Sequence, residues 1–345
     1  MSETPGWSSP DQPNQQPPQQ PQYGYNAPPP PVQPTIKPGV IPLRPLAVGE
    51  IVDGAITTMR RYPKQIIGVA AVVAAVTQIV GLLVQLPFLD DLTAVVSLDP
   101  NTMTPEQVAD QFTSAITGFL TGALLSVVLA LIGTVFLSGY ITVVVGHAVL
   151  GKQVTFGEAW AEFKPRLLPL LGATLLLGLA FTLLPILFLL PGIAMGSGPT
   201  VVLGIVICIP LVIWLWVRFA LVTPALVLER CGVGTAFGRS QKLVSGAWWR
   251  TFGILLLAFL ITIVIEWIIG LPFGLLGAAT TGFSDSPAAA LSAGSLTLST
   301  IGGVIASTIT LPFSAAVTVL LYVDRRMRSE GMDIELQRAA GHGGS

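Results

Sequence analysis

The sequence predicts an all-α integral membrane protein with six transmembrane helices in three hairpins. Six apolar segments are each long enough to cross a hydrocarbon core of roughly 30 Å, which needs about 20 helical residues. Charged residues make up only 10% of the chain, against about 25% in a soluble domain. With the N-terminus in the cytoplasm, all 17 Lys and Arg residues fall on the cytoplasmic side, and the outer connections hold only acids. We therefore expect a multi-pass protein of the plasma membrane with both termini cytoplasmic.

Residues 1–40 are expected to form a disordered cytoplasmic tail. The segment Met1–Pro38 is rich in Pro and Gln and contains neither Leu nor Phe, so it cannot bury enough apolar surface to offset its conformational entropy. Pro31–Pro34 fits a P-x-x-P docking pattern, which allows protein partners to bind the tail. A solvated tail without a fixed partner is the alternative. The membrane domain is expected over residues 41–325, and a cytoplasmic C-terminal tail over 326–345.

The segment Leu46–Tyr62 predicts an amphipathic helix at the cytoplasmic interface rather than a span. Its apolar stripe has helical spacing and consists of Val48, Val52, Ala55, Met59 and Tyr62. Its polar stripe consists of Glu50, Asp53, Thr57 and Arg60. Basic residues and Pro63 end the helix, as expected for its carbonyl end. The helix either recognises lipid or simply orients the first span.

The same arrangement recurs twice, which predicts three similar units. Val154–Phe163 is expected to form the second interfacial helix, and residues 233–250 contain the third. Each helix precedes a hairpin of two spans, so a threefold internal repeat is one interpretation. Convergence on common membrane rules is the other. The six spans are expected at Ile66–Phe88, Ile116–Val149, Leu167–Leu190, Thr200–Leu221, Thr251–Leu271 and Ser299–Val323.

The second span is longer than a membrane requires, so it should tilt or bend near Gly133 or Gly139. Upstream of it, the residues from Thr104 to Glu106 have the pattern of a helix start, which predicts a separate short helix in the outer connection. Prolines interrupt or end the later spans, which predicts either broken helices at a substrate site or ordinary kinks packed against neighbouring helices. These prolines are Pro185, Pro191, Pro210, Pro272 and Pro312.

Polar residues inside apolar runs mark a candidate intramembrane site. Glu266 in the fifth span is the first choice, because an ionised group in a bilayer is usually paired, solvated or functional. Gln78 and Gln85 are weaker candidates for the same cavity. Arg218 lies near the cytoplasmic end of the fourth span, where snorkelling gives it a structural explanation. Glu266 could also reach headgroup water, beside Trp267 as an interface anchor.

Catalytic and metal-binding patterns are absent from the sequence. It has no H-E-x-x-H, G-x-S-x-G or P-loop motif, and its only histidines are His147 and His342. Cofactors and metals are therefore not expected, and neither is enzymatic activity. No basic cluster has the interleaved aromatic residues of a nucleic-acid-binding face. The bilayer is the first expected partner, while the oligomeric state is left open.

Three segments carry a resemblance to a known family. They are Arg44–Ala55 with Arg60–Pro63, Ala236–Gly253 and Tyr322–Asp333. In these segments the chain resembles an actinobacterial multi-span family labelled glycerophosphoryl diester phosphodiesterase membrane domain. The Pro/Gln-rich leader looks like that of its mycobacterial-type members, described as proline- and glycine-rich transmembrane proteins. The resemblance implies a membrane region that accompanies a soluble catalytic domain in some relatives. That domain is not in this sequence, so we do not expect phosphodiesterase activity.

These motifs share the predicted cytoplasmic interface, which suggests an interlocking layer of charges there. Its members would be Glu50, Asp53, Arg60, Arg239, Lys242, Asp324 and Arg325, with Glu330 beyond them. A pair between Asp324 and Arg60 is one expected contact. Three functions are compatible with the sequence. The first is a non-enzymatic accessory or scaffold component of the cell envelope, the second a transporter or lipid-handling protein, and the third a membrane partner of a separate phosphodiesterase.

Overall fold

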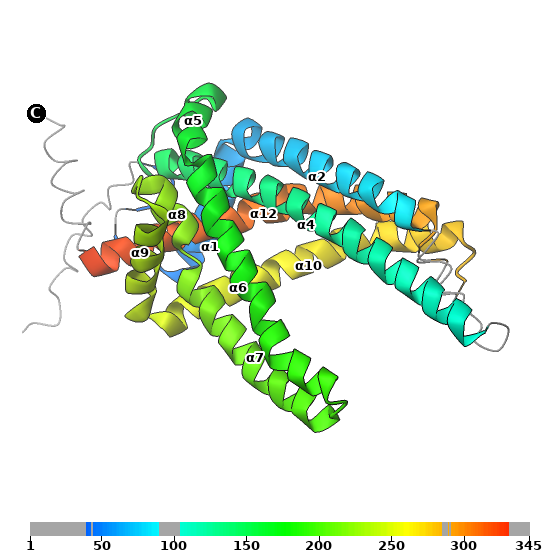
Figure 1. Ribbon diagram of the computed structural model, residues 1–345. Coiled ribbons are helices and arrows are strands. Elements are labelled where there is room, and N and C mark those ends of the chain that lie inside the picture. The colour runs from blue at the N-terminus through cyan, green and yellow to red at the C-terminus, as the bar shows by residue number, and fades with distance from the viewer. Residues whose placement is uncertain (1–38, 43, 90–103, 285–288, 290, 331–345) are drawn as a thin grey trace, which may run out of the picture. The chain divides into compact units, whose positions relative to one another are not determined.

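A computed structural model of the chain describes residues 39–42, 44–89, 104–284, 289 and 291–330 (Figure 1). All secondary structure in these residues is helical. Contacts divide the chain into residues 1–35 and 36–345, and every described residue belongs to the second unit. The expected disordered tail, except for Gly39 and Val40, lies outside the described residues. So does the C-terminal tail beyond Glu330.

Six helical segments are long and apolar enough to cross a membrane, which confirms the number and approximate position of the predicted spans. They are Lys64–Phe88, Leu124–Val149, Phe156–Ala194, Gly198–Leu228, Trp248–Thr280 and Ala293–Glu330. The last segment continues beyond the boundary expected at residue 325, because charged side chains of its final turns pair with Glu229 and with Arg239 of a neighbouring helix. The segments are therefore compatible with a multi-pass membrane protein.

The elements within and between these segments follow in chain order. The N-terminal half contains α1 (Val48–Arg61), a π-helical turn (Lys64–Gly68), α2 (Val69–Gln85), a 3₁₀ turn (Leu86–Phe88), α4 (Pro105–Val149) and α5 (Phe156–Phe163). A second 3₁₀ turn (Lys164–Arg166) leads into α6 (Leu167–Ala194). The remaining helices are α7 (Gly198–Phe219), α8 (Val222–Leu228), α9 (Val233–Ser245), α10 (Trp248–Thr280) and α12 (Ala293–Glu330).

The helix α12 is the centre of the packing. It contacts α10, α2, α4 and α1, and its second half is almost continuously buried from Pro312 to Arg325. Small residues allow close approach to it: a Cβ on Gly302 would lie 2.9 Å from the side chain of Phe273 in α10. Such contacts drive helix association in lipid, where burial of apolar surface offers no net gain.

The first helix, α1, buries one face against α12. Its buried residues are Ile51, Gly54, Ala55, Thr58 and Met59. The apolar stripe predicted for this helix is therefore correct at Ala55 and Met59, which are buried, but wrong at Val48, which is 37% exposed. The helix is rotated because Gly54 faces α12, and a Cβ there would lie 3.0 Å from the Leu320 side chain.

The helix α4 is continuous over 45 residues. Thr104 caps it, with its Oγ1 accepting a hydrogen bond from the Gln107 N–H at 3.3 Å. The predicted helix start is thus correct, but the expected separate short helix is wrong, because the same helix runs on into the span. Neither Gly133 nor Gly139 ends it. Both instead admit a neighbour: a Cβ at Gly139 would lie 2.1 Å from the Phe163 ring.

The helices α6 and α7 pack on each other (Figure 1). A Cβ on Gly204 would lie 2.3 Å from the Phe188 carbonyl oxygen, so the two backbones are in near contact. Gly196 has φ +60° in the turn that joins them, a conformation that favours glycine. Against the remaining helices this pair is buried near one end only, at Leu170, Ala173 and Val217.

The later prolines lie inside helices rather than at breaks. Pro185 and Pro191 are within α6, Pro210 within α7, Pro272 within α10 and Pro312 within α12. The helices are therefore not broken at these positions, which leaves the second interpretation, prolines within continuous helices. A proline removes one backbone hydrogen bond, and in a packed membrane helix neighbouring groups or small local adjustments tolerate that loss.

Candidate functional site

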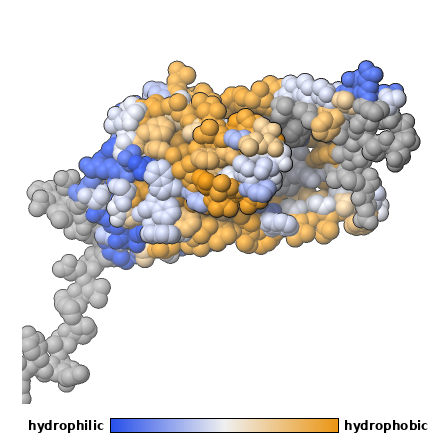
Figure 2. All heavy atoms as spheres, turned by 60° about the horizontal axis from the view of Figure 1, so that its bottom comes forward, coloured by the Kyte–Doolittle hydropathy of each residue, from blue (hydrophilic) through white to orange (hydrophobic). Residues whose placement is uncertain are grey.

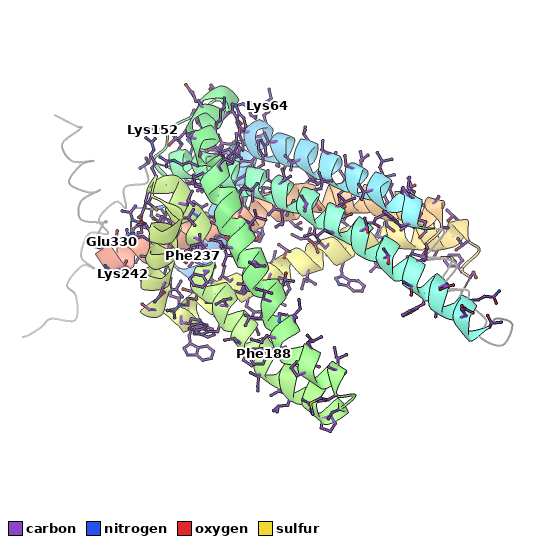
Figure 3. The ribbon with its side chains drawn as sticks, viewed as in Figure 1. Lys64, Lys152, Phe188, Phe237, Lys242 and Glu330 are labelled. Carbon is purple, nitrogen blue, oxygen red and sulfur yellow. The ribbon has the colours of Figure 1, made fainter. Side chains whose placement is uncertain are left out.

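Charged side chains gather at one end of the helix bundle. Figure 2 shows the larger group of hydrophilic residues there, a smaller one at the opposite end, and a hydrophobic surface along the middle of the molecule. Figure 3 places Lys64, Lys152, Lys242 and Glu330 at this same end. We call it the charged end. It contains two ion-pair clusters on neighbouring faces of α12.

The first cluster surrounds Asp324, whose side chain is fully buried. Its carboxylate accepts hydrogen bonds from the Leu46 backbone N–H at 2.8 Å, from Arg250 at 3.2 Å and from Arg328 at 2.9 Å. Both arginines also donate to the Leu46 carbonyl oxygen, at 2.6 and 2.8 Å. This Asp324 cluster therefore joins the segment before α1 to the start of α10 and the end of α12.

The second cluster surrounds Glu229, which directly follows α8. Arg239 donates two hydrogen bonds to its carboxylate, both at 2.7 Å, and also pairs with Glu330 at 2.7 Å. Tyr322 donates a short hydrogen bond to Glu229, and Arg326 lies 3.7 Å from the same carboxylate. Burial alone would raise the pKa of Glu229, but the hydrogen bonds from Arg239 and Tyr322 outweigh it, so the pKa lies below its ordinary value.

The expected charge layer is thus assembled from partly different residues. Arg239, Asp324 and Glu330 take part in the clusters, and Arg325 donates to the Leu243 carbonyl oxygen at 3.0 Å. Glu50 instead caps α1 by accepting from the Ala47 N–H at 2.7 Å, and it pairs with Arg44 at 2.6 Å. Three further members are exposed and form no ion pair within the described residues, namely Asp53, Arg60 and Lys242.

The expected contact between Asp324 and Arg60 is wrong, because Arg250 and Arg328 occupy the Asp324 carboxylate. The interpretation of the sequence also missed Glu229 and Arg328. A usable signal was present in α12, where Tyr322, Arg326 and Glu330 are spaced four residues apart and so share one face. Asp324 and Arg328 have the same spacing on the next face. No comparable signal identified Glu229, because its partners come from α9 and α12.

Polar side chains at the middle of the bundle line a cavity of about 440 Å³ between α2, α4 and α12, which we call the first cavity. Gln78 and Gln85 project into it from α2, Ser126 from α4, and Ser299 and Ser307 from α12. Gln78 donates to the Ser307 hydroxyl at 3.4 Å. Its amide fits beside α12 because residue 303 is glycine, where a Cβ would lie 3.0 Å from the amide nitrogen.

A second cavity, of about 340 Å³, lies closer to the charged end between α4, α6, α7, α8 and α12. Hydroxyl groups also line it, including those of Ser138, Thr142, Thr223 and Ser314. Among the described residues, no Asp, Glu, Lys, Arg or His lines either cavity. Both cavities therefore offer hydrogen bonds but no formal charge.

Several polar groups in the first cavity have spare hydrogen-bonding capacity. The Ser126 hydroxyl is buried and has no hydrogen-bond partner in the described part of the chain. Many other hydroxyls of the spans bond to the carbonyl four residues earlier, as Thr300 does with Leu296 at 2.7 Å. A buried hydroxyl without a partner costs about 1–3 kcal/mol. A ligand or water that accepts from Ser126 would recover that energy.

The four polar residues predicted inside the spans do not form one site. The structure brings Gln78 and Gln85 together in the first cavity. Glu266 instead lies on an exposed face of α10, where its carboxylate accepts from the Thr310 hydroxyl at 3.3 Å. Arg218 lies at the end of α7, with its guanidinium 4.5 Å from the centre of the Trp214 ring. A cation–π contact of this kind stabilises the charged side chain beside its own helix.

No group of three or more His, Cys, Asp or Glu residues in the described ranges is arranged to hold a metal ion. Cys208 and Cys231 are free thiols. Burial raises the pKa of Cys231, with Glu229 raising it further, so its reactive thiolate is disfavoured.

The fold and its cavities are thus compatible with a multi-pass membrane protein that has polar sites among its helices. Comparison with known proteins assigns the chain to a family. It belongs to the family described as a domain of unknown function (DUF7847), which it matches over residues 46–324. That range begins at Leu46 and ends at Asp324, the two residues joined in the Asp324 cluster. No curated protein and no solved structure matches the chain.

Proposed function

We propose that the chain is a non-enzymatic protein of the plasma membrane that binds an uncharged, hydrogen-bonding ligand in the first cavity, as a transporter or lipid-handling protein does. The observation that supports this is the polar lining of a 440 Å³ space among apolar helices, in which the buried Ser126 hydroxyl has no hydrogen-bond partner within the described residues. Polar groups inside a membrane are costly, so they are usually either paired or used. The residues that would hold the ligand are Gln85, Ser126 and Ser299, together with the Gln78–Ser307 pair.

The orientation belongs to the same proposal. Both termini are cytoplasmic, and the charged end faces the cytoplasm, as the positive-inside rule requires for its Lys and Arg residues. The helices α1, α5 and α9 lie at that interface and precede three hairpins, α2–α4, α6–α7 and α10–α12. In this arrangement the second cavity is nearer the cytoplasm, and the first is deeper in the bilayer.

An uncharged ligand is favoured because the lining could not compensate a charge. Bringing an ion into a site of low dielectric constant costs several kcal/mol unless an opposite charge meets it. The described residues of the first cavity supply amides, hydroxyls and apolar groups but no charge. A hydroxyl-bearing molecule matches these groups, whether it is a small polyol or the glycerol portion of a neutral lipid.

Native mass spectrometry of the gently extracted full-length protein tests the proposal. The variant combines Gln85→Leu, Ser126→Ala and Ser299→Ala, which removes three polar groups and adds no charge. Thr182→Val is the control, because Thr182 lies on α6 outside both cavities and its hydroxyl bonds to its own helix at 2.9 Å. We expect a bound neutral molecule in the wild type and in the control, and its loss from the triple variant. A wild type without ligand, or a triple variant that retains it, would contradict the proposal.

A non-enzymatic scaffold is the second candidate, and one observation favours it. The α6–α7 pair exposes large apolar side chains along most of its length, among them Leu187, Ile193 and Leu203. Such a surface suits either lipid or the spans of a partner protein. Proteins that co-extract with the wild type, and are lost when residues 1–38 are removed, would support the scaffold if no ligand is retained.

A further inference from the structure

The two cavities follow one another along the same pair of helices. On α4 the first cavity includes Ser126 and the second includes Thr142, which are 16 residues apart. That spacing corresponds to about 24 Å of helix at 1.5 Å per residue, which is most of a hydrocarbon core of roughly 30 Å. A polar lining that extends so far along the helix axis is more than a single ligand site requires.

Two residues line both cavities, and they are the point where the cavities meet. These residues are Thr134 on α4 and Leu311 on α12. Leu311 is half-buried and packs against the apolar core. The Leu311 side chain is larger than that of Thr134 and is apolar. Hydroxyl groups line the space on both sides of it. The Leu311 side chain therefore occupies the boundary between two polar spaces.

A proline lies directly after Leu311 in α12. Pro312 has no N–H to donate, so the Thr308 carbonyl lacks its usual helical partner. On the preceding residue, the Thr310 hydroxyl donates to Glu266 of α10 at 3.3 Å. A proline and a contact between helices thus flank Leu311. Helices commonly kink at a proline, where a small change of angle shifts a side chain.

We propose that Leu311 is a gate between the first and second cavities, which together form one path for an uncharged, hydroxyl-bearing solute along α4 and α12. This inference rests on the proposed function, because it assumes that the first cavity takes up a polar ligand. With Leu311 in its observed position the path is closed between the cavities. Bending of α12 at Pro312 withdraws the side chain and opens it.

Thiol labelling tests the gate without knowledge of the ligand. Both native cysteines are replaced by alanine, and a single reporter is introduced by Ser126→Cys in the first cavity or Ser138→Cys in the second. The probe is a methanethiosulfonate coupled to glucose, which is an uncharged, hydroxyl-bearing and membrane-impermeant thiol reagent. It is added to sealed vesicles so that it meets only the charged end of the protein. We expect rapid labelling of the Ser138→Cys reporter and slow labelling of the Ser126→Cys reporter.

Shortening Leu311 should then change only the deeper reporter. We expect Leu311→Ala to raise the labelling rate of the Ser126→Cys reporter roughly tenfold, as a modest reduction of a barrier would. Leu311→Phe should lower the labelling rate of the same reporter. A misfolded variant would not produce opposite changes for a smaller and a larger side chain. Leu187→Ala is the control, because Leu187 is 67% exposed on α6 and lines neither cavity.

The possible failures are distinguishable. Equal labelling of the Ser126→Cys reporter in the parent, Leu311→Ala and Leu311→Phe proteins would overturn the gate. If that reporter still reacts from the opposite side, the first cavity remains a polar site and the proposed function stands. If it reacts from neither side in any variant, the first cavity is not accessible to polar molecules. The proposed function then falls together with the gate.

Discussion

Replacement of Asp324 by asparagine should destabilise the helix bundle more than any substitution on its exposed charged surface. Asp324 is fully buried and accepts three hydrogen bonds, two of them from arginines that are each 32% exposed. The Leu46 N–H and Arg328 both donate to Oδ1, so asparagine can keep both bonds through its oxygen, but an NH₂ group in place of Oδ2 cannot accept from Arg250. The charge-assisted bond from Arg250, which contributes about 1.5–3 kcal/mol, is lost, and the bond from Arg328 is weakened because its acceptor is no longer charged. Partial solvation of the arginines favours the lower values, which gives a loss of about 2 kcal/mol in the free energy of unfolding.

Denaturation by sodium dodecyl sulfate in mixed micelles, followed by circular dichroism, measures this change. Asp53→Asn is the matched control, since Asp53 is exposed on α1 and has no ion pair in the described structure. It should change the free energy of unfolding by less than about 0.5 kcal/mol. An Asp324→Asn effect as small as that of the control would refute the assignment of the Asp324 cluster. A double-mutant cycle with Arg250→Gln would show whether the two side chains are energetically coupled.

Three further predictions concern other contacts. Gly139→Ala should destabilise the protein by about 1 kcal/mol or more, because the new Cβ would lie 2.1 Å from the Phe163 ring of α5. Gly253→Ala is the control, since a Cβ there meets no atom within 4 Å. Thermal unfolding in detergent measures the stability of both variants. Gly39→Ala should loosen the segment before α1, because a Cβ would lie 2.2 and 2.3 Å from the carbonyl oxygens that end α4. Limited proteolysis measures that effect, with Gly49→Ala as the unhindered control. Because the pKa of Glu229 is lowered in the folded state, its stabilisation is present above its ordinary pKa and is lost as the pH falls through the lowered value. The difference in stability between wild type and Glu229→Gln should therefore shrink as the pH falls below the ordinary pKa of a glutamate, and an unchanged difference would contradict the role of Arg239.

The spans could be predicted from the sequence because their signal is local and strong. A run of about 20 apolar residues has few alternatives to a membrane helix. Helix ends marked by capping residues, such as Thr104, were predictable for the same reason. Whether a helix continues past a proline was harder to predict from the sequence. Pro185 and Pro210 suggest breaks, yet both lie inside continuous helices. The rotation of α1 depended on Gly54 meeting α12, a contact between residues 266 positions apart.

The candidate sites were harder to predict because their residues come from distant segments. Polarity alone identified Gln78 and Gln85, and the structure places them in one cavity. The same criterion ranked Glu266 above these two glutamines, although Glu266 lies on an exposed face of α10 and does not line the first cavity. Serine and threonine hydroxyls carry little weight in a hydropathy profile, since many bond to their own helix. The cavity hydroxyl with no partner, Ser126, could be identified only once its neighbours were in place.

The loose attachment of the α6–α7 pair has a consequence for how the protein forms and comes apart. Only 6% of the most apolar stretch of the Phe156–Ala194 segment is buried inside the protein, against 50% for the segment that contains α12. Local opening requires least free energy where few contacts are lost. The pair should therefore separate from the other helices before they unfold, while α6 and α7 remain associated through Gly192 and Gly204. By the same reasoning it can enter the bilayer as an independent hairpin during synthesis, and dock onto α4 and α10 last.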